Sequence, residues 1–228
     1  MKHYYVLGNP INHSLSPKIF TFIFNKLNIH ASYYTYMPNN LIELKSFLNS
    51  EIKEFNGLNI TLPYKLDAYN LISEYDYFAQ LTQSVNCIKN INNSLVGYNT
   101  DYYGFLKMLD YIDLNHYDIL ILGNGGIART VAYALLESVD TKIFIWGRDR
   151  NNVDLFINSI NSKNIKSYNK KFNKPCIVIN CLSLTIDKNS IDMIINEILP
   201  SKIELFIDMN YTVTNMSQRL IIKKYNVI

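Results

Sequence analysis

The sequence predicts an α/β fold with two domains, each built on a mainly parallel sheet. Short apolar runs of strand length, rich in β-branched residues, recur along the 228-residue chain. Longer stretches with helical spacing lie between these runs, an alternation typical of parallel strands joined by crossover helices. A polar connector at residues 110–116 separates one series from the next. We therefore expect a first domain over residues 1–101, a second over residues 102–228, and a hinge between residues 101 and 116.

Each expected element comes from one of these two patterns. The apolar runs predict strands at residues 4–7, 57–61, 119–122, 143–146, 177–179 and 205–207. The helical spacing predicts helices at residues 16–27, 41–48, 64–75, 101–109, 126–137, 152–160 and 216–225.

Charge and cysteine content exclude several classes of protein. Lys and Arg number 22 against 19 Asp and Glu, so the net charge is +3, and like charges form no long run. We expect neither a nucleic-acid nor a membrane partner. No apolar run approaches bilayer-spanning length, and we expect a cytoplasmic protein. The 3 cysteines lack CxxC or Cys/His ligand spacing, so we expect no disulfide framework and no bound metal.

A glycine-rich turn joins the strand at residues 119–122 to the next helix and matches G-x-G-x-x-A. The residues of this turn are Gly123, Asn124, Gly125, Gly126, Ile127 and Ala128. Gly123 permits a tight turn, Gly125 lets a pyrophosphate approach the backbone, and Ala128 lets the helix pack closely on its strand. The alternative is an ordinary strand-to-helix loop that needs a positive φ. The strand before and the helix after favour a Rossmann-like dinucleotide site.

The end of the following strand bears on the choice between NADP and NAD. Arg148 and Arg150 stand there, and two guanidinium groups suit a 2′-phosphate because their donor forks bind phosphate bidentately. Asp149 between them would instead accept ribose hydroxyls in an NAD site. We expect NADP as the cofactor, with NAD as an alternative. The two arginines could also be ordinary solvated surface residues that bind no cofactor.

Polar side chains also follow the strands of the first half. Ser14 and Ser16 open a helix, with Ser16 expected at the N-cap, so capping and carboxylate binding are both open. Thr61 and Lys65 follow a second strand, where a lysine opposes the helix dipole unless a partner compensates it. Asn86 and Asp101 add an amide and a carboxylate at the ends of predicted strands or helices. Each of these residues alone would more often stabilise a turn than belong to a binding site.

Taken together, these segments resemble the shikimate dehydrogenase family over nearly the whole chain. The resemblance rests on GNPINHSLSP, NITLPYK, SVN, GYNTDYYGF and GNGGIAR, in this order. It implies an N-terminal domain that binds shikimate or 3-dehydroshikimate and a Rossmann-like domain that binds NADP. By this resemblance Ser14 and Ser16 would hold the substrate carboxylate. Residues Thr61, Asn86 and Asp101 would bind the ring hydroxyls, and Lys65 and Asp101 would be the catalytic pair in contact with substrate.

Two later segments extend the resemblance. Residues 180–183 resemble a family stretch near the cofactor, which implies a cofactor contact for Ser183. Residues 208–211 resemble a D-x-x-Y element, which implies a substrate contact for Tyr211. Family members continue with a G-x-x-M-L-x-x-Q element and helices that return to the first domain. This sequence ends at residue 228, so we expect those helices to be absent and activity to be weakened.

The resulting expectation is reversible, NADPH-dependent reduction of 3-dehydroshikimate to shikimate, on the route to chorismate and aromatic amino acids. A first alternative is a quinate/shikimate dehydrogenase that uses NAD. A second is a degenerate homologue that binds ligand without turnover. We expect a small-molecule substrate and a monomer or homodimer.

Overall fold

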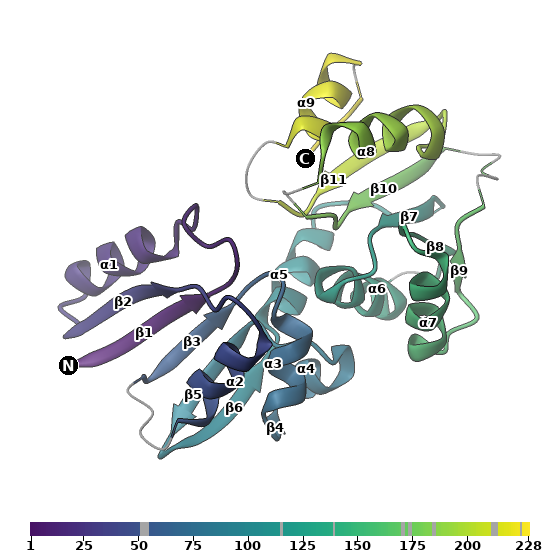
Figure 1. The fold of residues 1–228 in the computed structure, drawn as a ribbon. Coiled ribbons are helices and arrows are strands. Elements are labelled where there is room, and N and C mark those ends of the chain that lie inside the picture. Colours follow the sequence, from purple (N-terminus) through teal and green to yellow (C-terminus); the bar gives the residue numbers. More distant parts are fainter. Residues whose placement is uncertain are drawn as a thin grey trace. The chain divides into compact units, whose positions relative to one another are not determined.

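The computed structural model describes residues 1–50, 55–114, 116–138, 140–169, 172, 175–183, 186–210, 214–223 and 225–228. The chain divides into two compact units, Met1–Tyr103 and Gly104–Ile228. Each unit contains its own sheet, six-stranded in the first and five-stranded in the second (Figure 1). Among the described residues, no helix combines the length and apolar character that crossing a membrane requires.

The first unit is an α/β sandwich around the strand order β2-β1-β3-β5-β6-β4. Its strands are β1 (Lys2–Leu7), β2 (Ala31–Tyr36), β3 (Gly57–Ile60), β4 (Glu74–Tyr75), β5 (Cys87–Ile91) and β6 (Ser94–Tyr98). Its helices are α1 (Ser16–Lys26), α2 (Leu41–Asn49), α3 (Lys65–Leu71), α4 (Tyr77–Thr82) and the first turn of α5 (Thr100–Leu109), which continues into the second unit. Strands β2, β1 and β3 are parallel, whereas β5 is antiparallel to both of its neighbours.

Both faces of this sheet bury apolar side chains because strand residues alternate between them. On one face Val6 and Tyr33 pack against Phe24 of α1. On the other face a larger core joins strand side chains to helices α2, α3 and α4. The core members on that face are Leu7, Leu44, Leu48, Leu58, Ile60, Ala68, Ala79 and Ile88.

The hairpin β5–β6 turns on two asparagines. Asn92 and Asn93 have φ values of 52° and 67°, the left-handed region that two-residue hairpin turns need and that asparagine tolerates. The hairpin adds antiparallel strands beside β3, so the sheet is mostly but not wholly parallel.

The second unit is a doubly wound sheet whose five strands are all parallel, in the order β11-β10-β7-β8-β9. The strands are β7 (Asp118–Leu122), β8 (Ile143–Trp146), β9 (Ile165–Ser167), β10 (Cys176–Asn180) and β11 (Ile203–Asp208). The helices are α6 (Gly126–Ser138), α7 (Arg150–Ile160), α8 (Lys188–Met193), continued by a π-helical turn η1 (Ile194–Ile198), and α9 (Asn215–Ile222). Strands β7 and β10 are almost wholly buried, as expected for central parallel strands.

The structure confirms the predicted fold class, two α/β units with mostly parallel sheets. The predicted end of one helix was wrong. The helix expected over residues 64–75 ends at Leu71, and residues 74–75 form strand β4 instead. Strands β2, β4, β5, β6 and β9 and helices α4 and α8 were not predicted, because their sequences contain no continuous apolar run or long helical period.

Candidate active site

The first unit has a topological switch point between β1 and β3. The chain leaves β1 for β2 on one side of it and later returns to β3 on the other side. Ligands of open α/β sheets bind at such points, beside the carboxyl ends of the strands. The loops that follow β1 and β3 meet there, since the Asn9 amide donates to the Leu62 carbonyl oxygen at 3.0 Å.

Gly8 permits this close approach. A Cβ at residue 8 would lie 2.4 Å from Thr61 Cγ2 and 3.0 Å from the Leu62 carbonyl oxygen, so a larger residue would push the loops apart. Thr61 is half-buried, and its hydroxyl has no hydrogen-bond partner among the described residues. The Thr61 hydroxyl is therefore available to a ligand.

The serine pair lies at the start of α1, but not as predicted. Ser16 is not the N-cap: the N-cap is Leu15, which makes no side-chain capping bond, and Ser16 is the first helical residue. Ser14 Oγ accepts a hydrogen bond of 3.3 Å from the Ser16 amide. Neither serine is the N-cap, and the Ser14 oxygen satisfies one amide at the helix start, which leaves the Ser16 hydroxyl unexplained by helix capping.

Lys65 and Asp101 form an ion pair in the same unit. Lys65 begins α3, and its Nζ lies 2.7 Å from Oδ2 of Asp101 in the first turn of α5. The two side chains are 14% and 30% exposed, so the pair is more shielded from water than an ordinary surface ion pair. Asp101 supplies the negative partner that a lysine at a helix start needs.

Asn86 holds the second oxygen of the Asp101 carboxylate. Its Nδ2 donates to Asp101 Oδ1 at 2.8 Å and to Thr100 Oγ1 at 2.9 Å. Its Oδ1 accepts from the Thr100 amide at 2.8 Å. Asn86 is buried, and its two amide hydrogens are both directed at protein acceptors, so it fixes the carboxylate in place.

The second unit has its own switch point, between β7 and β10. The glycine-rich turn follows β7 there. Gly123 has φ +112° and its amide donates to the Trp146 carbonyl at 2.7 Å, so this position requires the conformational freedom of glycine. A Cβ at Gly125 would meet open space, and Ala128 is fully buried against the strand. The remaining turn residues, Asn124, Gly126 and Ile127, are half-buried. This geometry fits a dinucleotide whose phosphates meet the start of α6.

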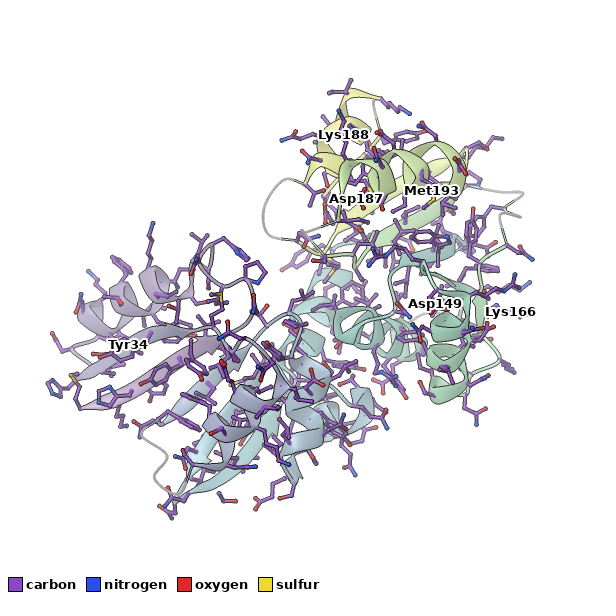
Figure 2. All side chains as sticks on the ribbon, in the orientation of Figure 1. Tyr34, Asp149, Lys166, Asp187, Lys188 and Met193 are labelled. Atoms are coloured by element: carbon purple, nitrogen blue, oxygen red, sulfur yellow. The ribbon has the colours of Figure 1, made fainter. Side chains whose placement is uncertain are left out.

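The three charged residues after β8 have different environments. Asp149 is the N-cap of α7, and its carboxylate accepts from the amides of Asn151 at 2.8 Å and Asn152 at 3.3 Å (Figure 2). Arg148 and Arg150 are exposed. The acid is thus engaged by its own helix, and the two guanidinium groups flank it.

The Asp208 carboxylate organises the edge where β10 and β11 end. It accepts from Asn180 Nδ2 at 3.1 Å, from Asn210 Nδ2 at 2.9 Å and from Thr214 Oγ1 at 2.7 Å, and also from the Ser217 hydroxyl. Ser183 is half-buried and lines a small cavity of about 170 Å³ with Asn180 and Thr214. Tyr211, the predicted substrate contact, lies outside the described residues.

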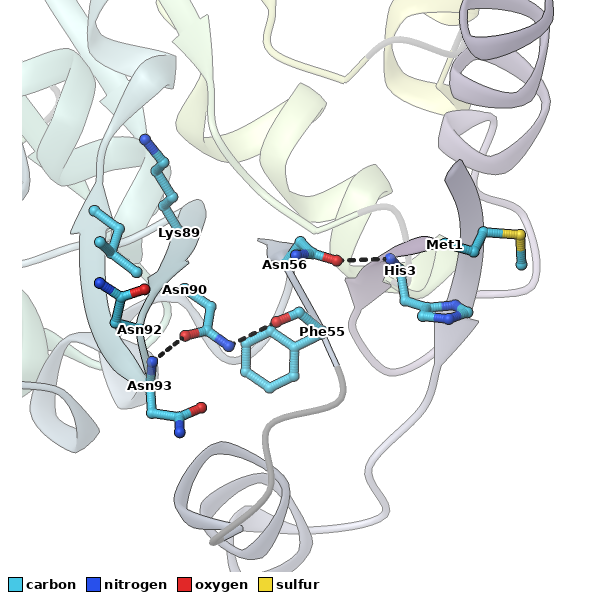
Figure 3. Close-up of a pocket in the computed structure, with 9 residues that line it drawn as sticks. Met1, His3, Phe55, Asn56, Lys89, Asn90, Asn92 and Asn93 are labelled. Atoms are coloured by element: carbon cyan, nitrogen blue, oxygen red, sulfur yellow. Dashed lines mark hydrogen bonds between the residues drawn. The ribbon is translucent and has the colours of Figure 1, made fainter. Parts of the chain in front are cut away.

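One hollow of the first unit lies away from these side chains. It measures about 800 Å³ and opens at the amino-terminal edge of the first sheet, where His3, Phe55 and Lys89 line it (Figure 3). Lys65 and Asp101 follow the opposite ends of β3 and β6. Among the described residues, no group of three or more His, Cys, Asp or Glu side chains could hold a metal ion.

Two residues of the first unit that the sequence did not single out lie beside the serine pair. Tyr33 on β2 donates to Asn59 Oδ1 on β3 at 2.5 Å. The segment at residues 59–65 was noted, but Asn59 was given no role, and β2 was not expected at all. Only the pairing of β1 with both strands brings Tyr33 near Asn59.

Known proteins share these sequence and structural features. A family model described as the shikimate dehydrogenase substrate binding domain matches residues 6–88. The curated "Shikimate dehydrogenase (NADP(+))" of Aquifex aeolicus is 28% identical over 95% of this chain and 80% of its own length. The protein of the same name from Staphylococcus haemolyticus is 32% identical over 85% of this chain and 72% of its own length.

A solved structure of shikimate 5-dehydrogenase from Thermus thermophilus in complex with shikimate also matches. It is 26% identical with a TM-score of 0.79, over 100% of this chain and 85% of the solved one. The Aquifex aeolicus shikimate dehydrogenase structure, 24% identical with a TM-score of 0.79, has the same fold over 100% of this chain and 85% of its own. The chain belongs to the shikimate dehydrogenase family.

Proposed function

We propose that the chain is an NADP-dependent shikimate dehydrogenase, which reversibly reduces 3-dehydroshikimate to shikimate on the route to chorismate and aromatic amino acids. The observation that carries this proposal is the shielded Lys65–Asp101 ion pair, 2.7 Å long, at the carboxyl edge of the first sheet. The curated relatives named for this activity support it.

The substrate would bind in the first unit. Ser14 and Ser16 would donate to its carboxylate, as two hydroxyls that do not serve as the N-cap of α1. The Thr61 hydroxyl and the Asp101 carboxylate would bind ring hydroxyls, with Asn86 beside them. Tyr211 keeps its predicted role as a further contact to the substrate carboxylate.

Ketone reduction places negative charge on the carbonyl oxygen. When bound, reduced NADP would supply the hydride that the carbonyl carbon accepts. The Lys65 ammonium would stabilise the charge that develops on the oxygen and donate the proton that completes the hydroxyl. Asp101 would keep Lys65 oriented and charged through its Oδ2, while Asn86 holds Oδ1. In the oxidation direction, neutral Lys65 would accept the hydroxyl proton.

The second unit has the features that NADP requires. The turn from Gly123 to Ala128 would bind the pyrophosphate, and Ser183 would lie near the cofactor. Arg148 and Arg150 would bind the 2′-phosphate, with Asp149 between them. Because Asp149 already accepts hydrogen bonds from the start of α7, it is a poor ribose ligand, and this favours NADP over NAD.

The domain roles and cellular setting belong to the same proposal. Residues 1–101 would form the substrate domain and residues 102–228 the NADP domain. A cytoplasmic location and a monomeric or homodimeric state remain predictions.

An absorbance assay at 340 nm tests the function. The purified chain should reduce NADP when shikimate is added, and should do so faster than with NAD or with quinate. Faster turnover of quinate with NAD would favour the alternative quinate/shikimate dehydrogenase. If calorimetry detects shikimate binding but no cofactor is reduced, the chain is a binding homologue and the proposed activity is wrong.

A further inference from the structure

Tyr33 is a buried tyrosine beside the proposed carboxylate site. It is 8% exposed and belongs to the small core formed with Val6, Ile11 and Phe24. Its ring stacks on Phe20 of α1, with centroids 4.6 Å apart and planes within 2°. A phenol buried this deeply needs a hydrogen-bond partner for its hydroxyl.

The Tyr33 hydroxyl interacts with side chains on two separate elements. It donates to Asn59 Oδ1 on β3 at 2.5 Å. The Ser16 side chain, on the first residue of α1, interacts with the same hydroxyl. Burial raises the pKa of Tyr33 well above its usual value, and the interaction with Ser16 lowers it in part. The phenol is therefore protonated at neutral pH and remains a donor to Asn59.

This arrangement links the two loops of the switch point. Ser16 follows β1, and Asn59 stands at the end of β3, two residues before Thr61. Because Asn59 Oδ1 is occupied by Tyr33, its amide nitrogen is directed elsewhere, and it has no partner among the described residues. Stacking on Phe20 holds the Tyr33 ring, so the position of the hydroxyl is set by the core.

We propose that Tyr33 is a positioning residue for substrate binding: its ring packs on α1, its hydroxyl is bonded to Asn59, and it so orders the polar groups of the substrate site that follow β1 and β3. The role rests on the proposed function. It acts through Ser16 and Asn59, not through contact with the reacting carbonyl. It therefore concerns ground-state affinity for the acid more than the rate of hydride transfer.

The test is Tyr33→Phe, which keeps the ring on Phe20 and removes the hydroxyl. We expect KM and the calorimetric Kd for shikimate to rise roughly three- to tenfold, the range for one or two neutral hydrogen bonds. The kcat and the KM for NADP should stay within about twofold. Tyr34→Phe is the matched control: Tyr34 is the next residue of β2, 41% exposed, with its ring near His3 and Tyr5 (Figure 2).

A double-mutant cycle with Ser16→Ala separates positioning from general loosening of the fold. The two substitutions should raise the Kd for shikimate less together than the product of their separate effects, because Tyr33 acts in part through Ser16. Independent, multiplicative effects would overturn the proposal, as would an unchanged Kd in Tyr33→Phe. A fall in kcat alone, or equal changes in the KM values of shikimate and NADP, would also overturn it.

These results are distinct from failure of the proposed function. If the wild type binds shikimate without turnover, the Kd values still decide the role of Tyr33. A wild type that neither binds nor oxidises shikimate overturns both proposals.

Discussion

At the residue scale, the site depends on one carboxylate that holds two different groups. Asp101 places Oδ2 on Lys65 and Oδ1 on Asn86. A charged pair with 14% and 30% exposed side chains has a fixed geometry that a freely solvated lysine lacks. The orientation of Lys65 therefore depends on residues of three different segments of the chain.

Lys65→Met should reduce kcat by about 100-fold or more, because it removes a proton donor and a positive charge used mainly in the transition state. The Kd for shikimate, measured by calorimetry, should change little. Lys107→Met is a suitable control, since the Lys107–Asp110 pair on α5 is 82% and 59% exposed and should leave kcat unchanged. A near-normal kcat in Lys65→Met would rule out the mechanism.

Ser14→Ala should raise KM for shikimate roughly tenfold while the melting temperature stays nearly constant. The reason is that Ser14 is not the N-cap of α1, and its contribution to the helix start is a long hydrogen bond of 3.3 Å from the Ser16 amide. Ser32→Ala, at the other end of the sheet, should change neither quantity. A lowered melting temperature with an unchanged KM would show that Ser14 has a structural role instead.

At the element scale, residues at the start of α7 have two different roles, helix capping and the proposed binding of a phosphate. Asp149 caps the helix, while Arg148 and Arg150 are exposed on either side of it. The same short segment thus contains a structural acid and two candidate phosphate ligands. The printed sequence gives no sign of this division, because capping depends on which amides the acid reaches.

Replacing Arg148 and Arg150 together by Gln should weaken the binding of NADP at least tenfold and the binding of NAD by less than about twofold. A 2′-phosphate loses charge-assisted hydrogen bonds in the variant, whereas NAD has no group there to lose them. Cofactor affinities can be measured by fluorescence titration, with Lys166→Gln on β9 as an exposed control (Figure 2). Equal losses for the two cofactors would contradict the assignment.

The elements that sequence patterns missed have local physical explanations. Strand β2 is polar and aromatic rather than apolar, because it lies at the edge of its sheet. The β5–β6 hairpin did carry a signal, the pair Asn92-Asn93, which accepts two successive left-handed residues. Helix α4 is too short to show a helical period. Its one local signal is the N-cap Asp76, whose carboxylate accepts a hydrogen bond of 2.7 Å from the Ala79 amide.

At the scale of the whole molecule, each unit has its own core and its own switch point. The residues proposed for substrate belong to the first unit, apart from Tyr211. The residues proposed for NADP belong to the second. The two binding reactions should therefore respond to different substitutions.

Asp208→Ala should cost roughly 2–4 kcal/mol in the free energy of unfolding of the second unit, because donors on Asn180, Asn210, Thr214 and Ser217 lose a shared acceptor. NADP affinity should fall, and the Kd for shikimate should stay within about twofold. Urea unfolding and calorimetry measure these quantities. Asp187→Ala, which removes one exposed cap of α8, should lower the free energy of unfolding much less. Equal losses of affinity for both ligands would contradict this separation.

The sequence by itself determined the fold class, the glycine-rich turn and the polar segments that follow the strands. It could do so because the spacing of apolar residues and the placement of glycines determine local structure within a few residues. The central strands β7, β8 and β10 were found because burial on both faces requires a continuous apolar run.

The tertiary structure alone decided which polar side chains meet. The Lys65–Asp101 pair spans 36 residues and the Tyr33–Asn59 pair 26, so no local pattern specifies either contact. The N-cap at Leu15 and the engaged Asp149 likewise depend on backbone geometry at single amides. Strand order brings the loops after β1 and β3 together, and this long-range pairing turned separate motifs into a candidate site.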